Sequence, residues 1–186
     1  PTPNVVGATN SFSQVGFLAT YDSNGNFISH IEYDFNSWYA YRLAFDEADN
    51  LYVAGSFRGL VDFDFTGGSD IRNASSGDGV FLTKLNPTLG QYAWTRTVGE
   101  LDSLTDVWVQ ELDISDDKVV LLSSFAGASV DLDPSPSSAI FANASSQPGG
   151  NATTISLMDT SGGFLRGGII GAKLHGFEPW DASISS

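Results

Sequence analysis

Residues 42–64, RLAFDEADNLYVAGSFRGLVDFD, return in altered form as residues 109–133, VQELDISDDKVVLLSSFAGASVDLD. The offset is 67 residues between Asp46 and Asp113 and 69 residues between Asp62 and Asp131. Self-similarity at such a spacing is typical of architectures built from repeated supersecondary units. Apolar and β-branched runs around turn-forming Asp, Asn and Gly indicate that each copy contains a pair of β-strands.

A second element recurs between these copies. It is seen in residues 17–22 (FLATYD), 81–86 (FLTKLN) and 154–159 (TISLMD), and a glycine turn and another strand-like segment follow each time. Four strands per unit are typical of β-propeller blades. We therefore expect strand a at about residues 41–47 and 107–114, strand b at 51–57 and 118–125, strand c at 80–86 and 153–159, and strand d at 91–98 and 163–170. The variable b-to-c connections, residues 67–79 and 134–152, are expected to be surface loops.

A family resemblance is carried by residues 49–57 (DNLYVAGSF), 61–64 (VDFD) and 78–86 (DGVFLTKLN), with Trp94 after Gly90. These stretches resemble the long β-propeller repeats of secreted bacterial proteins, and the resemblance spans roughly residues 12–171. It implies an all-β fold of tandem propeller-like blades and a role as scaffold or surface module. The second unit departs from the pattern, because Ser123 and Ser124 replace the Ala-Gly step and Ser156 replaces the lysine of strand c.

The repeats predict an open array. Half a unit, strands c and d, precedes the first strand a, and the total of about 2.5 to 3 blades is fewer than the roughly four to eight that close a propeller. We expect an N-terminal strand or arm at residues 1–15, propeller-like repeats at 16–171 and a C-terminal strand or tail at 172–186. Two alternatives remain: the chain is a piece of a larger propeller, or its units stack as a β-sandwich.

The two ends of the chain resemble the missing strands. Residues 3–12 resemble strand b, and residues 180–186 resemble strand a. Because sheet edges accept further strands, copies of this chain are expected to join by strand addition, which yields an open filament unless the rotation closes. The residues expected to carry this assembly are Val5, Val6, Phe12, Trp180 and Ile184. The chain begins at Pro1, so we also expect a processed or cropped segment that has lost a signal peptide.

Composition excludes several classes of partner. Eight Lys and Arg residues face 22 Asp and Glu residues, a net charge of -14 that repels nucleic acid and anionic membranes. The absence of cysteine excludes disulfides, thiolate nucleophiles and cysteine zinc sites. No stretch approaches the roughly 18 to 20 apolar residues of a membrane span, so we expect no membrane insertion. The expected location is extracellular or at the cell surface.

The acidic pairs Asp62 with Asp64 and Asp131 with Asp133 recur at equivalent places. Alternate residues of a strand point to one face, so each pair could offer oxygen ligands to Ca²⁺. The competing interpretation is an exposed polar face, with the neighbouring side chains Val61, Phe63, Val130 and Leu132 pointing inward. Residues 22–26 (DSNGN) also resemble the start of a calcium loop, but a hairpin turn is favoured there and at residues 47–50 and 115–118.

The sequence contains two kinds of candidate glycan site, one for attachment and one for binding. Asn73, Asn143 and Asn151 begin Asn-X-Ser/Thr sequons in the b-to-c connections, so they are candidate glycosylation sites. Trp38, Trp94, Trp108 and Trp180 could form a sugar-binding platform, although core packing is the default for three of them.

No catalytic arrangement stands out. The two histidines, His30 and His175, lie beside no G-x-S-x-G motif, and the paired glycines lack phosphate-loop spacing. We therefore expect a non-enzymatic extracellular structural subunit that assembles with copies of itself. The alternative is a fragment of a larger secreted propeller that binds a glycan or a protein in adhesion.

Overall fold

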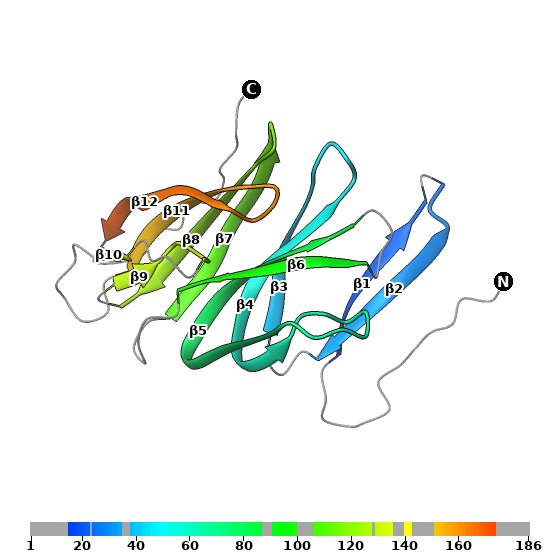
Figure 1. The fold of residues 1–186 in the computed structure, drawn as a ribbon, viewed down its shortest axis with the longest axis horizontal. Coiled ribbons are helices and arrows are strands. Elements are labelled where there is room, and N and C mark those ends of the chain that lie inside the picture. Colours follow the sequence, from blue (N-terminus) through cyan, green and yellow to red (C-terminus); the bar gives the residue numbers. More distant parts are fainter. Residues whose placement is uncertain are drawn as a thin grey trace.

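The computed structural model describes residues 15–22, 24–34, 38–86, 91–99, 106–127, 129–135, 140–142 and 151–173. Every regular element in these ranges is a strand, which confirms the all-β class (Figure 1). The strands are β1 (Val15–Tyr21), β2 (Phe27–Asp34), β3 (Trp38–Phe45), β4 (Leu51–Asp62), β5 (Ile71–Leu85), β6 (Tyr92–Val98), β7 (Asp106–Ser115), β8 (Lys118–Ala126), β9 (Ser129–Asp131), β10 (Ile140–Ala142), β11 (Asn151–Asp159) and β12 (Phe164–Lys173).

The two repeats form two separate four-stranded sheets. The first sheet has the order β3-β4-β5-β6 and the second has the order β7-β8-β11-β12, and all neighbouring strands are antiparallel. These orders confirm the predicted succession a, b, c, d in each unit. Strands β1 and β2 form a two-stranded sheet, called here the N-terminal hairpin, and β9 with β10 forms another. None of the sheets closes on itself.

Three hairpins turn in the same way because an aspartate caps each of them. Asp22 accepts hydrogen bonds at Oδ1 from the backbone N–H groups two and four residues later, at 2.9 and 2.8 Å. Asp46 and Asp159 make the same two contacts at 2.8–3.0 Å. The fourth residue of each turn has a positive φ: Gly25 (81°), Asp49 (61°) and Gly162 (83°). These contacts confirm the hairpin interpretation of residues 22–26 and 47–50.

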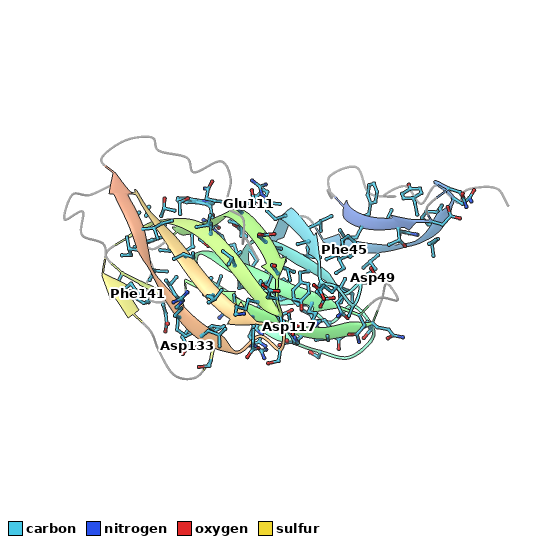
Figure 2. All side chains as sticks on the ribbon, turned by 90° about the horizontal axis from the view of Figure 1, so that it is seen from above. Phe45, Asp49, Glu111, Asp117, Asp133 and Phe141 are labelled. Atoms are coloured by element: carbon cyan, nitrogen blue, oxygen red, sulfur yellow. The ribbon has the colours of Figure 1, made fainter. Side chains whose placement is uncertain are left out.

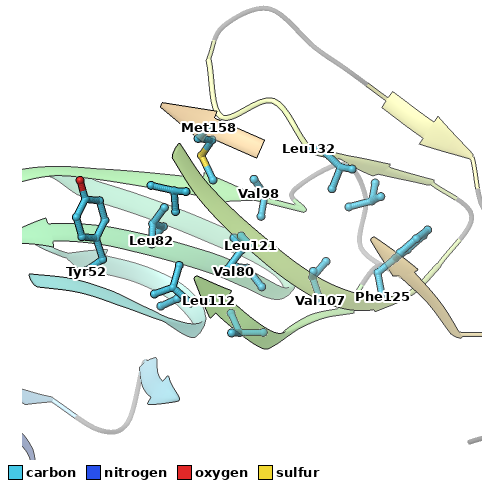
Figure 3. Close-up of a cluster of buried hydrophobic side chains, with 14 of the residues drawn as sticks. Tyr52, Val80, Leu82, Val98, Val107, Leu112, Leu121, Phe125, Leu132 and Met158 are labelled. Carbon is cyan, nitrogen blue, oxygen red and sulfur yellow. The ribbon is translucent and has the colours of Figure 1, made fainter. Parts of the chain in front are cut away.

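Both faces of the first sheet are covered along the start of β4. All seven residues at the start of β4, from Leu51 to Phe57, are buried, whereas a strand with one solvated face alternates. One face packs on the second sheet through an inter-sheet core (Figure 3). Its buried members are Tyr52, Ala54, Val80, Leu82, Val98, Val107, Val109, Leu112, Val119, Leu121, Phe125, Val130, Leu132, Ala152 and Met158.

The opposite face of the first sheet packs on the N-terminal hairpin through Leu18, with Ile31 beside it. The chain that follows β4 covers another part of this face, where the Phe63 ring lies 5.3 Å from the Phe57 ring and 4.9 Å from the Phe81 ring. Val61 and Phe63 are buried, as are Val130 and Leu132 at the equivalent place in the second unit. The predicted inward orientation of these four side chains is therefore confirmed.

Three sequence-based expectations are wrong. Residues 134–152, expected to be a surface loop, contain β10 and the first residues of β11. Much of residues 67–79 is strand, because β4 and β5 continue past a bulge near Gly59 and pair as far as Asp62 with Ile71. The offset of 67 residues in strand a also fails. The bulges after Ala40 and after Val109 place the two a strands 69 residues apart, so Phe45 is equivalent to Ile114. The second unit joins its strands with a shorter turn, in which Asp116 and Asp117 have φ of 50° and 58°.

Candidate functional site

The acidic pairs are used to cap their own backbone. Asp62 accepts hydrogen bonds at Oδ1 from the N–H groups of Asp64 (3.0 Å) and Asp70 (2.9 Å). Asp64 accepts in the same way from Thr66 (2.9 Å). These bonds bend the chain away from the end of β4.

The second unit repeats this pattern. Asp131 accepts from the N–H of Asp133 at 3.0 Å, and Asp133 accepts from the N–H of Ser135 at 2.9 Å. In the first unit the backbone N–H groups of Asp70 and Asp64 lower the pKa of Asp62. Within the described ranges no three His, Cys, Asp or Glu side chains gather where they could hold a metal ion. The recurrence of the acidic pairs is thus accounted for by turn formation, and calcium binding stays a prediction.

A group of partly buried polar side chains connects the two sheets. The ammonium of Lys84 lies 3.4 Å from Asp46 and donates to the carbonyl of Thr160 at 3.2 Å. The hydroxyl of Tyr52 donates to Asp46 at 3.1 Å and lies 3.4 Å from the same carbonyl. Burial, followed by the nearby charge of Asp46, raises the pKa of Tyr52 well above its usual value. These side chains of the first sheet hold the β11–β12 turn of the second.

The same turn is held at a second point. Arg96 on β6 donates from Nε to the carbonyl of Gly162 at 2.9 Å, and its guanidinium lies 5.1 Å from the ring centroid of Trp94. A Cβ at Gly162 would lie 2.8 Å from Arg96 Nε. Elsewhere between the two units, the N–H of Gly99 donates to the carbonyl of Asp131 at 3.0 Å. The arrangement is that of a structural joint, and its polar groups face carbonyls of the chain itself.

Aspartate 46 is charged at this joint despite its burial. Burial opposes ionisation, but hydrogen bonds from Asn50 and Tyr52 and the charge of Lys84 outweigh it and lower the pKa of Asp46. A lowered carboxyl pKa does not suit a general acid at neutral pH. The aspartate therefore acts as an anchor for Lys84 and Tyr52, and sequence reasoning missed this role because the three residues meet only when strand and turn registers are known.

The aromatic candidates have different surroundings in the described structure. Trp94 is partly buried, packs edge to face with Tyr52 at 5.9 Å and carries Arg96 over its face. Trp108 is partly buried on β7. His30 lies on the exposed N-terminal hairpin, 5.9 Å from the Phe27 ring. Trp180 and His175 lie outside the described residues, as does the side chain of Trp38.

The sequons lie in different settings from those expected. Asn73 is exposed on β5, where it pairs with Leu60, so this candidate lies on a strand and not in a loop. Asn151 begins β11 and pairs with Ala126 and Lys173. Asn143 lies outside the described residues. Glycosylation of these three positions stays a prediction.

The assembly candidates Val5, Val6, Phe12, Trp180 and Ile184 all lie outside the described residues. Among the described residues, most exposed large apolar side chains lie on the strands nearest the N-terminus. Seven of the eleven exposed large apolar side chains belong to β1, β2 and β3. They are Phe17, Tyr21, Phe27, Ile28, Tyr41, Leu43 and Phe45.

Comparison with known proteins adds no further identification. No family model, no curated protein and no solved structure matches this chain. In the described ranges no helix is long and apolar enough to cross a membrane.

Proposed function

We propose that this chain is a non-enzymatic structural subunit, located outside the cell or at the cell surface, whose copies join into an open assembly by addition of β-strands. One observation carries the proposal. The repeated unit has four strands in the first and second sheets, yet the N-terminal hairpin has two among the described strands. Strands a and b of this unit are not among the described strands, and a strand c without such neighbours leaves backbone groups and apolar surface for another strand to cover.

The direction of stacking supports serial assembly. The first sheet packs one face on the N-terminal hairpin and the other on the second sheet, so the three layers follow one another in one direction (Figure 1). A β-sandwich buries one face of each sheet and leaves the other solvated. Continuous burial along the start of β4 favours propeller-like units that repeat in series. Such a contact is heterologous, and it extends into a filament unless its rotation closes a ring.

The polar groups of the described region favour a structural role over catalysis. Asp22, Asp46 and Asp159 cap turns, and Asp62 caps the exit from β4. Lys84 and Arg96 donate to main-chain carbonyls. Each of these groups is used in holding strands and turns together.

The proposal is tested by the size of the full chain in solution. Light scattering over a wide range of concentration is expected to show masses well above the monomer, and negative-stain images are expected to show fibres. A variant without residues 1–12 is expected to lose most of this assembly. A monomeric full chain at the highest concentration, with no fibres, contradicts the proposal. Because the net charge is -14, added salt is expected to favour assembly by screening repulsion between copies.

A further inference from the structure

The strongest unexplained surface lies at the β3 edge of the first sheet. Leu43 and Phe45 on β3 are 54% and 60% exposed. Both point to the face that carries the N-terminal hairpin, because they pair with Val53 and Leu51. Figure 2 shows Phe45 on the side of the sheet where that hairpin lies. Exposed apolar patches on soluble proteins commonly mark interaction sites.

The second sheet shows what this edge looks like when it is covered. Leu112 and Ile114 on β7 are equivalent to Leu43 and Phe45, because they occupy the same places after the same bulge and pair with Leu121 and Val119. Leu112 is only 6% exposed, and Ile114 is partly buried against the inter-sheet core. The two equivalent positions are therefore apolar in both repeats of the chain, but they are covered in only one repeat.

The cover on the second sheet comes from strands a, b and c of the unit before it. Strand β7 lies against β3, β4 and β5. Ala44 on β3 and Tyr52 and Ala54 on β4 belong to the inter-sheet core that buries Leu112. By this precedent, full cover of Leu43 and Phe45 needs strands a and b of a preceding unit in addition to its strand c.

The N-terminal hairpin supplies the other half of that preceding unit. Residues 17–22 (FLATYD) resemble strand c at 81–86 (FLTKLN) and 154–159 (TISLMD), and the turn that follows has glycine at the positive-φ position, Gly25, as the β11–β12 turn has Gly162. Strands β1 and β2 therefore correspond to strands c and d. In the two sheets, strand c has a neighbour on each side, β5 between β4 and β6, and β11 between β8 and β12. The position for strands b and a is thus beside β1 and over Leu43 and Phe45.

We propose that strand a at this position is the C-terminal segment, residues 174–186, of a second copy of the chain. This inference rests on the proposed function and names its docking site. After β12, which is strand d of the second unit, the repeat order calls for a strand a, and residues 180–186 resemble one. Residues 3–12, which precede β1, resemble strand b. The tail of one copy and the head of the next then complete one four-stranded unit.

A complementation experiment with full-length and tail-less chains tests this site. The donor variant, Leu43→Lys with Phe45→Lys, keeps its tail but has a charged docking site. The acceptor variant lacks residues 174–186. A matched control, Leu60→Lys with Ile71→Lys, changes two side chains that are 70% and 61% exposed on the β4–β5 extension and alters the net charge equally.

Wild type and the control are expected to form long assemblies. Each of the two other variants is expected to stay monomeric alone, and their equimolar mixture is expected to give a heterodimer and nothing larger. Since the docked Leu and Phe side chains are buried, the donor variant is expected to need roughly 100-fold or more higher concentration to assemble. Circular dichroism is expected to show the same melting temperature for donor variant and wild type as monomers.

The outcomes separate this inference from the proposed function. If wild type does not assemble, the proposed function fails. If wild type and the donor variant assemble equally well, assembly stands and this docking site is wrong. If the donor variant stays monomeric but its mixture with the acceptor variant yields no heterodimer, the tail is not the segment that docks. Loss of assembly in the control as well as the donor variant also overturns the site, because the effect is then one of charge alone.

Discussion

Strands β3 and β7 hold the same place in the two units, and they differ in what lies against them. Each is strand a of its unit and lies at one edge of its sheet. In each strand an apolar pair follows a bulge, Leu43 with Phe45 and Leu112 with Ile114. The first sheet covers Leu112, whereas Leu43 is more than half exposed. The apolar pattern of a repeat therefore shows which face of a strand can be buried. Whether that face is buried depends on the presence of a neighbouring unit.

The largest expected effect separates these two strands. We expect Leu112→Ala to lower the free energy of unfolding by roughly 2–4 kcal/mol, because it leaves a cavity in the inter-sheet core. Leu43→Ala at the equivalent position is expected to cost less than about 0.5 kcal/mol in the monomer, as is usual for an exposed site. Urea titrations at low protein concentration measure both.

The contrast between β3 and β7 would be wrong if the two substitutions lowered the free energy of unfolding by the same amount. Equal and large losses would mean that Leu43 is buried in the monomer in solution. The Leu43→Ala variant should also be measured at high protein concentration. There it is expected to weaken assembly while the monomer stays folded.

A second contrast concerns two of the c-to-d turns, β1–β2 and β11–β12. Gly162 and Gly25 have nearly the same φ, 83° and 81°, but a Cβ at Gly162 would meet Arg96 while a Cβ at Gly25 would have nothing within 4 Å. We expect Gly25→Ala to cost about 1 kcal/mol for the left-handed backbone alone. Gly162→Ala is expected to cost roughly 2–3 kcal/mol, because it adds a displacement of Arg96 to the same strain. Thermal melting of the two variants gives the difference.

The double variant Gly162→Ala with Arg96→Ala is the matched control. Removal of the Arg96 side chain is expected to bring the cost of the alanine at position 162 down to that at position 25. If the cost at position 162 stays higher, contact with the first sheet is not its cause.

Acid should weaken the capped turns. Hydrogen bonds from Ser161 and Gly163 lower the pKa of Asp159, and those from Asn26 and Asn24 lower that of Asp22. A carboxyl whose folded pKa is depressed adds stability above its unfolded pKa of about 3.9, and this stability is lost as the pH falls through the lower folded value. We expect the urea midpoint to be flat near neutral pH and to fall below about pH 4.

Asp159→Asn sharpens this result. The variant is expected to be less stable than wild type at pH 7, and the two curves should converge in strong acid, where the wild-type carboxyl is also neutral. Parallel curves over the whole pH range would show that ionisation of Asp159 does not contribute. The effect is expected to be smaller than that of Gly162→Ala, because the carboxylate is partly exposed to water.

Local patterns in the sequence were enough to predict the strands and their order. The repeat around residues 42–64 predicted strands a and b, and the alternation in VDFD correctly placed Val61 and Phe63 inside. The alignment of Asp46 with Asp113 failed, because sequence similarity does not reveal a bulge or a shortened turn.

The joint between the sheets could not be predicted in the same way. Lys84 and Arg96 meet the carbonyls of Thr160 and Gly162, residues that are 76 and 66 positions away. A carbonyl is present at every residue, so no side-chain pattern marks the one that will be used. The exposure of Leu43 was hidden for a related reason, since an apolar residue in a strand has the same pattern whether or not a partner covers it.

The smallest expected effect is a gain in stability at the a-to-b turn. Asp49 has a φ of 61°, where the two equivalent turns have glycine at Gly25 and Gly162. The left-handed conformation is strained for a residue with a Cβ, so we expect Asp49→Gly to stabilise the fold by about 0.5–1 kcal/mol. The greater entropy of glycine in the unfolded chain sets the upper limit of this gain. Asp49→Ala serves as control and is expected to give no gain, because it removes the charge but keeps the strain. A rise in melting temperature for both variants would assign the gain to the loss of one negative charge from an acidic protein, and the backbone argument would then fail.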